Sequence, residues 1–434
     1  MKWLSSKDRP MHLGKYKMEK IRRVDKPTTY ISDDVPRVPK RANFFTRAAK
    51  GDLGEKAKFE RTHRFAKTPL SMALRKMSST HDDIHDGKVA PEKAPITDDP
   101  VKIAEHIKSF CHFLDADMVG ICEVPDYAWY SHDNDGTPIE PYHKYAIVIV
   151  TDQGYDTLEA ASGDDWISNA QSQRAYLVGS TIACNVADYI RQLGWPARAH
   201  TATKSDVLHL PLTLLSGIGE LSRIGELVLN PFLGPRFKTT IVTTDLPLAI
   251  DKPIDFGLQD FCSKCLKCAN ECPCSAISFG DKIMFNGYEM WKPDVARCTS
   301  YRVTNQKGAS CGRCMKMCPF NKEGLLSHRI GLWLAINAPF LRRLLARMDD
   351  WFEYGKRNRD GKWWWDHENV EGRYVWAKGE NQRDLKAELR PSPDDKYAIF
   401  PADTMPAPDA SGPVPVDRAA GIKRRAEADR PPKA

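Results

Sequence analysis

The sequence lacks any long apolar run. Among its 434 residues, no stretch reaches the roughly 18 consecutive apolar residues of a membrane-spanning helix. The best candidate, GLWLAINAPFL at 331–341, is too short and contains Pro339. An export signal is missing as well, because Arg22 and Arg23 lead into the polar segment VDKPTTYISDD. We therefore expect a cytoplasmic protein that does not bind a membrane.

Two common nucleotide-binding loops are also absent. No Walker loop occurs, and GIGELSRIGE at 217–226 has Gly217 and Gly219 but Ser222 where a dinucleotide-binding loop needs its third glycine. A basic nucleic-acid-binding face is not indicated either. Residues 1–50 hold fourteen Lys and Arg against five Asp and Glu, an excess larger than the net charge of +7. The charge thus marks an N-terminal arm, and we expect no nucleic-acid partner.

Hydrophobic periodicity predicts a layered domain over about 98–250. The segment at 99–114 has apolar residues at helical spacing, and a long helix is predicted from about 165 to 193. KYAIVIVT at 144–151 is a nearly continuous apolar run, typical of a strand that is buried on both faces. Further strands are predicted at 116–124, 196–202 and 238–246. Strands that alternate with helices favour an α/β or α+β architecture.

We divide the chain into five parts by composition. These are a basic, Pro-rich arm that wraps the body (1–95), the layered core (96–257), a Cys-rich module (258–325), a helical and Trp-rich segment that covers a pocket (326–400), and a Pro/Ala-rich tail or linker (401–434).

Eight of the twelve cysteines fall into two motifs, C-x2-C-x2-C-x3-C-P and C-x12-C-x2-C-x3-C-P. This spacing is typical of iron–sulfur clusters, and in two-cluster ferredoxins the fourth cysteine of each run ligates the other cluster. We therefore assign one [4Fe–4S] cluster to Cys262, Cys265, Cys268 and Cys318, and a second to Cys272, Cys298, Cys311 and Cys314.

Zinc sites or buried free thiols are the alternative interpretations of the cysteines, but a zinc site has no need of the proline that ends each motif. Cys274 lies beside the ligands, and we interpret it as a small packed residue rather than a substitute ligand. Cys111, Cys122 and Cys184 lie in predicted helices or strands and are expected in the core.

Three stretches resemble the reductive dehalogenase family. They are SGIGELSRIGELVLNPFLGPRFKTTIVTTDLPL (216–248), FCSKCLKCANECP (261–273) and CTSYRVTNQKGASCGRCMKMCPFNK (298–322). The likeness covers about 96–325, and KPTTYISDDVPRVPKRANFFTRAAKGD in the arm and KWWWD near the C-terminus also resemble dehalogenases. This family is similar to the epoxyqueuosine reductases, with which it shares a cobalamin-binding core and two [4Fe–4S] clusters. The missing export signal matches its cytoplasmic, catabolic branch.

The resemblance implies a nitroreductase-like core that holds base-off cobalamin without a lower protein ligand, joined to a two-[4Fe–4S] ferredoxin-like module. No Asp-x-His-x-x-Gly motif, which would supply a protein histidine to cobalt, occurs in the sequence. Some catabolic members continue into a flavin and ferredoxin reductase. Because this sequence ends in the linker-like segment, we expect an external ferredoxin, flavodoxin or reductase as the electron donor, or a truncated chain.

The resemblance also implies three reacting residues: a tyrosine that protonates the carbon losing halogen, a lysine that tunes it, and an arginine that grips the acidic group of the substrate. The matching positions are Tyr176, Lys238 and Arg302. An ammonium beside a phenol makes it a stronger acid, and a guanidinium binds carboxylate or phenolate with two parallel hydrogen bonds. Without the resemblance, Tyr176 fits plain helix packing, Lys238 fits an exposed lysine at a strand end, and Arg302 fits a structural ion pair.

Small and aromatic residues complete the predicted pocket. A stripe of small residues runs beneath Tyr176 and either leaves room for a flat group such as a corrin ring or permits close helix packing. It consists of Gly179, Ser180, Ala183 and Ala187. We expect cobalamin contacts at Gly179, Ser180, Ala183, Gly217, Gly219 and Gly234. We also expect Trp363, Trp364 and Trp365 to line or cover the pocket, against the alternative of plain packing.

The predicted reaction is the removal of halide from a halogenated phenol or aromatic acid, with electrons passing from an outer cluster to an inner one and then to cob(I)alamin. Lys238 and Arg302 favour such substrates over haloalkenes. Two alternatives stay open. An epoxide reductase that acts on tRNA would need a catalytic acidic residue and a basic docking surface, and an electron-transfer subunit would bind no corrinoid.

Overall fold

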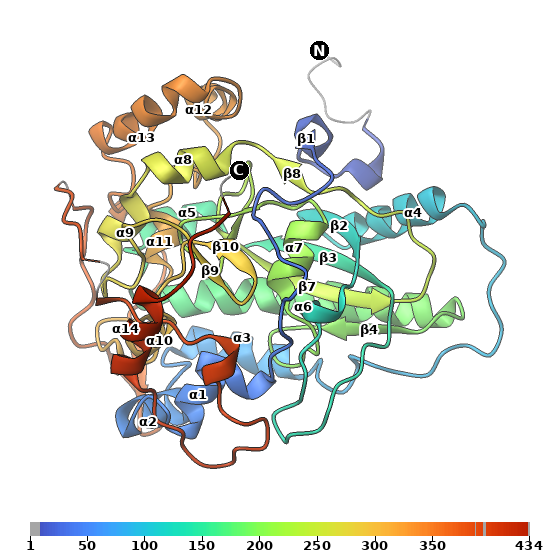
Figure 1. The fold of residues 1–434 in the computed structure, drawn as a ribbon, viewed down its shortest axis with the longest axis horizontal. Helices are drawn as coiled ribbons and strands as arrows, with labels where there is room; N and C mark the ends of the chain where they lie inside the picture. Colours follow the sequence, from blue (N-terminus) through green and yellow to red (C-terminus); the bar gives the residue numbers. More distant parts are fainter. Residues whose placement is uncertain (1–8, 387, 394–395, 433–434) are drawn as a thin grey trace.

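The computed structural model describes residues 9–386, 388–393 and 396–432, and a four-stranded sheet lies at its centre (Figure 1). The strand order is β2 (Met118–Glu123), β3 (Tyr145–Asp152), β7 (Phe237–Thr244) and β4 (Ala197–His200). Each strand lies where the sequence predicts one. All neighbouring strands are antiparallel, so of the two expected architectures the core is α+β. The first eight residues of the predicted arm and the last two of the predicted tail lie outside the described residues.

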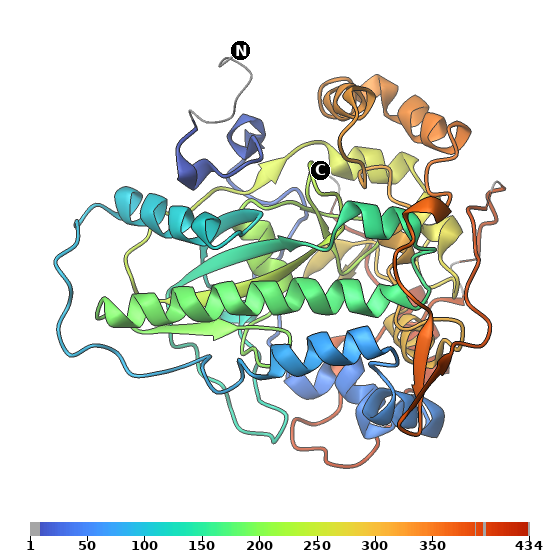
Figure 2. The same cartoon turned by 180° about the vertical axis from the view of Figure 1, so that it is seen from behind.

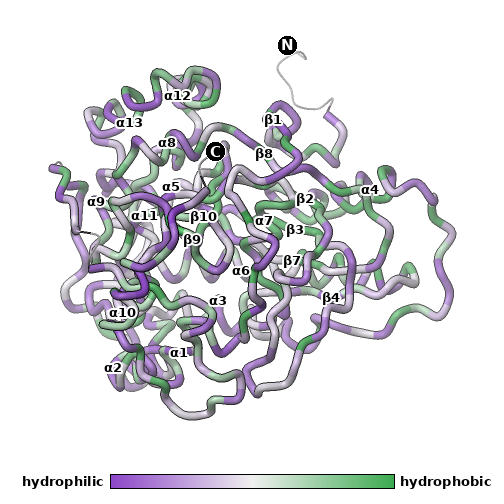
Figure 3. The backbone as a smooth tube through the Cα atoms, viewed as in Figure 1, coloured by the Kyte–Doolittle hydropathy of each residue, from purple (hydrophilic) through white to green (hydrophobic). Residues whose placement is uncertain are grey.

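Both faces of this sheet are buried, which explains the apolar run in β3. Ile147 and Ile149 point to one face, where they pack with α4 (Pro100–Phe113) and α6 (Ile167–Gln192). Val148 and Val150 point to the other, where α7 (His209–Leu215) lies. Figure 2 shows α6 crossing this side of the sheet, and in Figure 3 the central strands are largely hydrophobic. A strand covered on both sides needs apolar residues at every position.

The end of α6 is fixed by Gly194. Leu193 caps the helix, and Gly194 follows with φ +90°, the left-handed conformation that ends many helices. A Cβ at this position would lie 2.6 Å from the carbonyl oxygen of Glu92, so the arm packs directly on the helix end. The predicted long helix therefore has the expected bounds.

The Cys-rich module packs beside the core. Its elements are α8 (Leu258–Lys264), α9 (Lys267–Glu271), the hairpin β9 (Ile283–Phe285) and β10 (Tyr288–Met290), α10 (Val295–Thr304) and α11 (Arg313–Lys316). Two short antiparallel pairs border it: β5 (Glu220–Leu221) with β6 (Val228–Leu229), and β1 (Arg22–Arg23) with β8 (Ile254–Asp255). The arm thus reaches the start of the module through a strand pair.

The arm contains three helices that the sequence reading did not predict. They are α1 (Phe44–Lys50), α2 (Glu55–His63) and α3 (Pro69–Ser79). Helix α3 packs along α6, while α1 and α2 pack against α10. These helices are short, and short helices depend on tertiary packing more than on their own sequence pattern.

The region after the module holds the remaining elements. These are α12 (Leu326–Asn337), the turn Pro339–Leu341, α13 (Arg342–Trp351), the hairpin β11 (His367–Val370) and β12 (Arg373–Trp376), and α14 (Arg418–Ala426); α5 (Tyr155–Ala160) precedes α6. Pro339 separates α12 from α13. None of the described helices is both long and apolar enough to cross a membrane.

Residues 396–432, which we call the C-terminal strap, lie on the body rather than extending from it as the predicted linker would. Arg41 donates hydrogen bonds to the carbonyl oxygens of Ala410 and Gly412, at 3.0 and 3.1 Å. Asp52 accepts from Arg41 and Arg47, and also from the backbone N–H of Val414. The Pro/Ala-rich composition gave no sign of these contacts, because they use the strap backbone.

Replacing Asp52 with alanine is expected to destabilise the protein by about 3–5 kcal/mol, since two buried guanidiniums would lose their counter-charge. Asp52 and Arg41 are 3% and 0% exposed. Thermal unfolding followed by circular dichroism measures the change. Asp25→Ala is the matched control, because its pair with Lys252 is on the surface and its loss should not be measurable. A melting temperature of Asp52→Ala equal to that of the wild type would contradict this role of Asp52.

Candidate functional site

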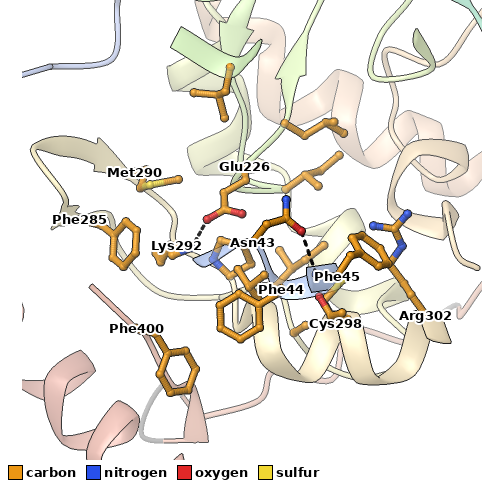
Figure 4. Close-up of a pocket in the computed structure, with 18 of the residues that line it drawn as sticks. Asn43, Phe44, Phe45, Glu226, Phe285, Met290, Lys292, Cys298, Arg302 and Phe400 are labelled. Carbon is orange, nitrogen blue, oxygen red and sulfur yellow. Dashed lines mark hydrogen bonds and ion pairs between the residues drawn. The ribbon is translucent and has the colours of Figure 1, made fainter. Parts of the chain in front are cut away.

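A cavity of about 530 Å³ lies where the core, the Cys-rich module, the arm and the strap meet (Figure 4). Phe44 and Phe45 come from α1, Phe285 from β9, and Phe400 from the strap. In Figure 4, Phe285 lies at one end and Arg302 at the other. Most of the wall is apolar, so a large, mainly apolar group fits this space better than a small polar one.

The eight motif cysteines form two groups that differ in their relation to the cavity. Cys272, Cys298, Cys311 and Cys314 all line it, whereas Cys262, Cys265, Cys268 and Cys318 do not; these four belong to a buried apolar cluster that also includes Cys272. Burial and the neighbouring thiol Cys262 raise the pKa of Cys318 well above its usual value. Burial, with Cys298 and Cys272 close by, raises the pKa of Cys314 to about 12. The fourth cysteine of each motif therefore lies with the other motif's thiols.

Cys274 lies beside Cys272, with the two Sγ atoms 3.7 Å apart. Hydrogen bonds from the Cys274 thiol and from the backbone N–H of Ala276, which lies 3.3 Å from the Cys272 Sγ, lower the pKa of Cys272 to about 6. The pKa of Cys274 is raised in turn. The shifts favour Cys272 over Cys274 as the thiolate of this pair, and the ligand role of Cys272 stays a prediction.

Lys238, which lines the cavity, lies beside Tyr176, which is not itself among the residues of the cavity wall. Lys238 is the second residue of β7, opposite Thr151 of β3, and lines the cavity. Its Nζ atom lies 5.3 Å from the centroid of the Tyr176 ring. Tyr176 is half-buried and follows Ser172, which also lines the cavity, by one turn of α6. The sheet and the long helix therefore hold the ammonium and the phenol together.

Arg302 projects from α10 into the cavity wall. Its guanidinium lies 4.7 Å from the ring centroid of Phe45, and its Nη2 donates to Ser310 Oγ at 3.3 Å. Its Nε is buried without a hydrogen-bond partner, and it forms no ion pair with any described carboxylate. A structural ion pair was the alternative role, and the described residues do not provide one. A partly buried guanidinium whose Nε has no partner is suited to an anionic ligand.

The cavity wall carries little acidic charge. Glu226 is the single acidic side chain among the described residues that line it, and Lys292 pairs with its carboxylate (Figure 4). His209 is the single histidine of that wall, and both of its ring nitrogens are engaged, with Thr239 and with Ser205. Burial lowers the pKa of His209 to about 4, so the ring is neutral.

The stripe of small residues on α6 does not face the cavity. Gly179 packs against the sheet, where its carbonyl oxygen accepts a hydrogen bond from Thr240 Oγ1 at 3.0 Å. Ala183 lies in the core with Ile147, and Ser180 is buried as well. The expected space for a corrin beneath Tyr176 is therefore filled by helix-on-sheet packing, the alternative reading of the same pattern.

The other three glycines serve close backbone contacts. A Cβ on Gly217 would lie 2.3 Å from the carbonyl oxygen of Lys252, one on Gly219 would lie 2.0 Å from that of Leu229, and one on Gly234 would lie 2.6 Å from that of Phe320. All six positions expected to contact cobalamin are described, and none of them lines the cavity.

No protein-family model matches the chain. The solved structure of the catabolic reductive dehalogenase NpRdhA is 47% identical, with a TM-score of 0.94, over 98% of this chain and 63% of that one. The chain belongs to the reductive dehalogenase family. NpRdhA has also been solved in complex with 3-bromo-4-hydroxybenzoic acid. A further solved structure, again 47% identical with a TM-score of 0.94, is reported to suggest a mechanism for B12-dependent dehalogenation.

Curated relatives, from the reductive dehalogenases and from the related epoxyqueuosine reductases, match less of the chain. The tetrachloroethene reductive dehalogenase of Dehalobacter restrictus is 32% identical over 244 residues, which are 54% of this chain and 42% of that protein. Epoxyqueuosine reductase of Salmonella typhimurium is 29% identical over 135 residues, 28% of this chain and 31% of that protein. The chain thus spans less than two thirds of the length of these relatives. The predicted family, and its relationship to the epoxyqueuosine reductases, are confirmed.

The three tryptophans of this dehalogenase-family chain do not line the cavity. Trp363 and Trp365 are 63% and 76% exposed, and Trp364 packs with Ala160 and Ile167 near the start of α6. The expectation that they line the pocket was wrong, and the plain-packing alternative applies to Trp364. The part of segment 326–400 that does reach the cavity is its end, 398–400.

The sequence reading missed several cavity residues of this dehalogenase-family chain. Asn43 caps α1, because its Oδ1 accepts from the N–H of Phe45 at 2.9 Å, and this cap sets Phe45 against Arg302. An Asn before two apolar residues is a recognised helix-start signal. Tyr130 and His209 carried no comparable signal.

Proposed function

We propose that this chain is a cobalamin-dependent reductive dehalogenase that removes halide from a halogenated phenol or hydroxybenzoate. One observation carries the proposal: a single large apolar cavity is lined by one group of cluster cysteines, by Lys238 and by Arg302. A source of electrons, a cation beside a phenol and an anion-binding group thus open onto the same space. The family and the B12-dependent relative support this interpretation.

The two cysteine groups fit two [4Fe–4S] clusters in a ferredoxin-like module. Each group has four thiols, and the fourth member comes from the other motif, as in two-cluster ferredoxins. Within the described part of the chain, no three His, Cys, Asp or Glu side chains are placed to share one metal ion. The four thiolates of a [4Fe–4S] cluster bind four different irons, whereas the thiolates of a zinc site all bind one ion. All twelve cysteines are free, in keeping with a cytoplasmic location.

The cavity fits cobalamin held base-off in a nitroreductase-like core. It is large and mainly apolar, and the cysteines of the second group lie in its wall. His209 is already engaged through both nitrogens, so no histidine of the described wall is free to serve as a lower ligand. Bound there in its reduced form, cobalamin would supply the electron pair that expels halide from carbon.

The chain's own residues donate the proton and bind the substrate. Replacing a carbon–halogen bond by a carbon–hydrogen bond consumes two electrons and one proton and releases halide. Tyr176 donates the proton, and the ammonium of Lys238, 5.3 Å from its ring, stabilises the phenolate that remains. Arg302 binds the phenolate or carboxylate of the substrate through its free donors, while the apolar wall excludes water.

The electrons are proposed to come from an external carrier. Only the second cysteine group lines the cavity, so its cluster is the inner one and the cluster of the first group is the outer one. Each carrier molecule would give one electron, and two such transfers would supply the electron pair that one turnover consumes.

Anaerobic reconstitution with iron, sulfide and cobalamin tests the function. With titanium(III) citrate as reductant and 3-bromo-4-hydroxybenzoate as substrate, we expect stoichiometric bromide and 4-hydroxybenzoate. NpRdhA was solved with the same bromophenol, which is why this substrate is chosen. Protein that holds corrinoid and both clusters but releases no bromide would overturn the proposal.

Replacing Arg302 with glutamine is expected to raise KM for 3-bromo-4-hydroxybenzoate by roughly 10- to 100-fold, because one charge-assisted pair is lost in the ground state and the transition state alike. The rate constant kcat should change much less. Initial rates of bromide release measure both constants. Arg297→Gln is the control on the same helix, since Arg297 bonds to Ser275 and does not line the cavity. A large fall in kcat at unchanged KM would contradict a role in substrate binding.

A further inference from the structure

Helices α12 and α13 present an exposed apolar surface, which we call the hairpin face. It consists of Leu325, Leu326, Ile330, Trp333, Phe340, Leu344, Trp351 and Phe352. Trp333 is 62% and Phe340 is 83% exposed. The opposite side of α12 is apolar too, because Leu332 and Ile336 pack inward. A cluster of exposed large apolar side chains marks an interaction site.

The inner sides of α12 and α13 pack toward the first cysteine group. Leu332, Ile336 and Leu345 pack on a buried apolar cluster that contains Cys262, Cys265, Cys268 and Cys318, and also Cys272. Lys267, which lies between Cys265 and Cys268 in the sequence, forms an ion pair with Asp349 of α13. Arg342 bonds to Asp260 of α8 at 2.8 Å. Figure 1 places α12 and α13 beyond α8, at the outer edge of the molecule.

The unpaired charges of α12 and α13 are positive. Arg329, Arg343 and Arg347 are exposed, and none of them pairs with a described acidic residue. The two acidic residues of α13 are already neutralised: Asp349 by Lys267 and Lys322, and Asp350 by Lys267 at 3.0 Å. A protein that complements this surface has an apolar centre and an acidic rim.

We propose that the hairpin face is the docking site of a small, acidic ferredoxin-type electron carrier. The inference rests on the proposed function, because it requires a cluster on the first cysteine group. Reduced carrier bound here is oxidised by one electron, and the outer cluster behind the face is reduced by one electron. Two such events supply the electron pair that one dehalogenation consumes. The apolar centre provides close contact, and the three arginines steer the acidic carrier.

Binding is measured by calorimetry between the reconstituted holoprotein and an oxidised acidic [2Fe–2S] ferredoxin. Trp333→Ala and Phe340→Ala are each expected to weaken binding by roughly 10- to 100-fold, as central aromatic residues of interfaces do. Trp376→Ala is the matched control, because Trp376 is 68% exposed on β12 and lies outside the face. Phe340 lies in a turn and is almost fully exposed, so its loss should leave folding intact.

Charge is tested separately. Arg343→Gln with Arg347→Gln should slow association several-fold at low salt and flatten its dependence on ionic strength. Arg373→Gln, an exposed arginine of β12, is the control and should change neither. Unchanged binding in both the aromatic and the arginine variants would overturn the proposal, as would finding the face buried in a dimer of this chain or adsorbed to lipid vesicles.

The choice of reductant separates this inference from the proposed function. With reduced ferredoxin as donor, Trp333→Ala should release bromide at least 10-fold more slowly than the wild type at low ferredoxin concentration. With titanium(III) citrate, which needs no docking site, the two rates should be equal. If the wild type releases no bromide with titanium(III), the proposed function fails, while the calorimetric result still decides the docking site. Equal slowing with both reductants would contradict docking.

Discussion

Replacing Tyr176 with phenylalanine is expected to lower the rate of halide release by about 10²–10⁴-fold, the usual contribution of a positioned general acid. The ring stays in place beneath Lys238, 5.3 Å from its Nζ, and only the hydroxyl group is lost. The proton must then come from water, which the apolar wall of the cavity excludes. Substrate binding should be unchanged, because it is assigned to Arg302.

The readouts separate catalysis from assembly. Visible spectra of the reconstituted variant should show bound corrinoid and both clusters at wild-type levels. Bromide release in single turnovers should be slow, and KM should be close to the wild-type value. Tyr189→Phe is the matched control on the same helix, because its hydroxyl pairs with His106 on the exposed side at 2.8 Å. Full activity in Tyr176→Phe would remove this residue from the mechanism.

The core was predictable from the sequence because its physical requirements are local. The β3 strand is covered on both faces and therefore needs an unbroken apolar run, and Gly194 ends α6 with a positive φ. The arm helices and the strap obey no such local rule. Asp52 holds the strap through backbone groups of residues more than 350 positions away, and no pattern in either segment reports that contact.

The site was predictable to different degrees. The spacing of the cysteines predicts how they group, and in the structure Cys272, Cys298, Cys311 and Cys314 share the cavity wall while the other four motif cysteines do not reach it. The small residues beneath Tyr176 were ambiguous, because close packing on a sheet and contact with a flat ligand both demand small side chains; Thr240 fills the space at Gly179. The cavity wall draws on four distant segments, so its shape depends on the fold rather than on any one motif.

Replacing Cys272 with alanine is expected to remove one cluster and abolish ferredoxin-driven turnover. The holoprotein should fall from about eight iron atoms per chain to about four, since a [4Fe–4S] cluster needs all four thiolates. Alanine is preferred to serine because a serine oxygen can replace a thiolate. Cys274→Ala is the matched control: its Sγ is only 3.7 Å from that of Cys272, yet it should retain about eight irons and its activity. Iron loss in Cys274→Ala with none in Cys272→Ala would exchange their roles.

The same measurement decides how the chain crosses between the clusters. If Cys318 belongs with Cys262, then Cys318→Ala combined with Cys262→Ala should lose no more iron than either variant alone, because both changes strike one cluster. Cys318→Ala combined with Cys314→Ala should lose nearly all of it, although these two cysteines share a motif. An uncrossed chain predicts the reverse for both pairs. Because only the second group lines the cavity, this pair of double variants also establishes which cluster faces the substrate and which one faces the donor.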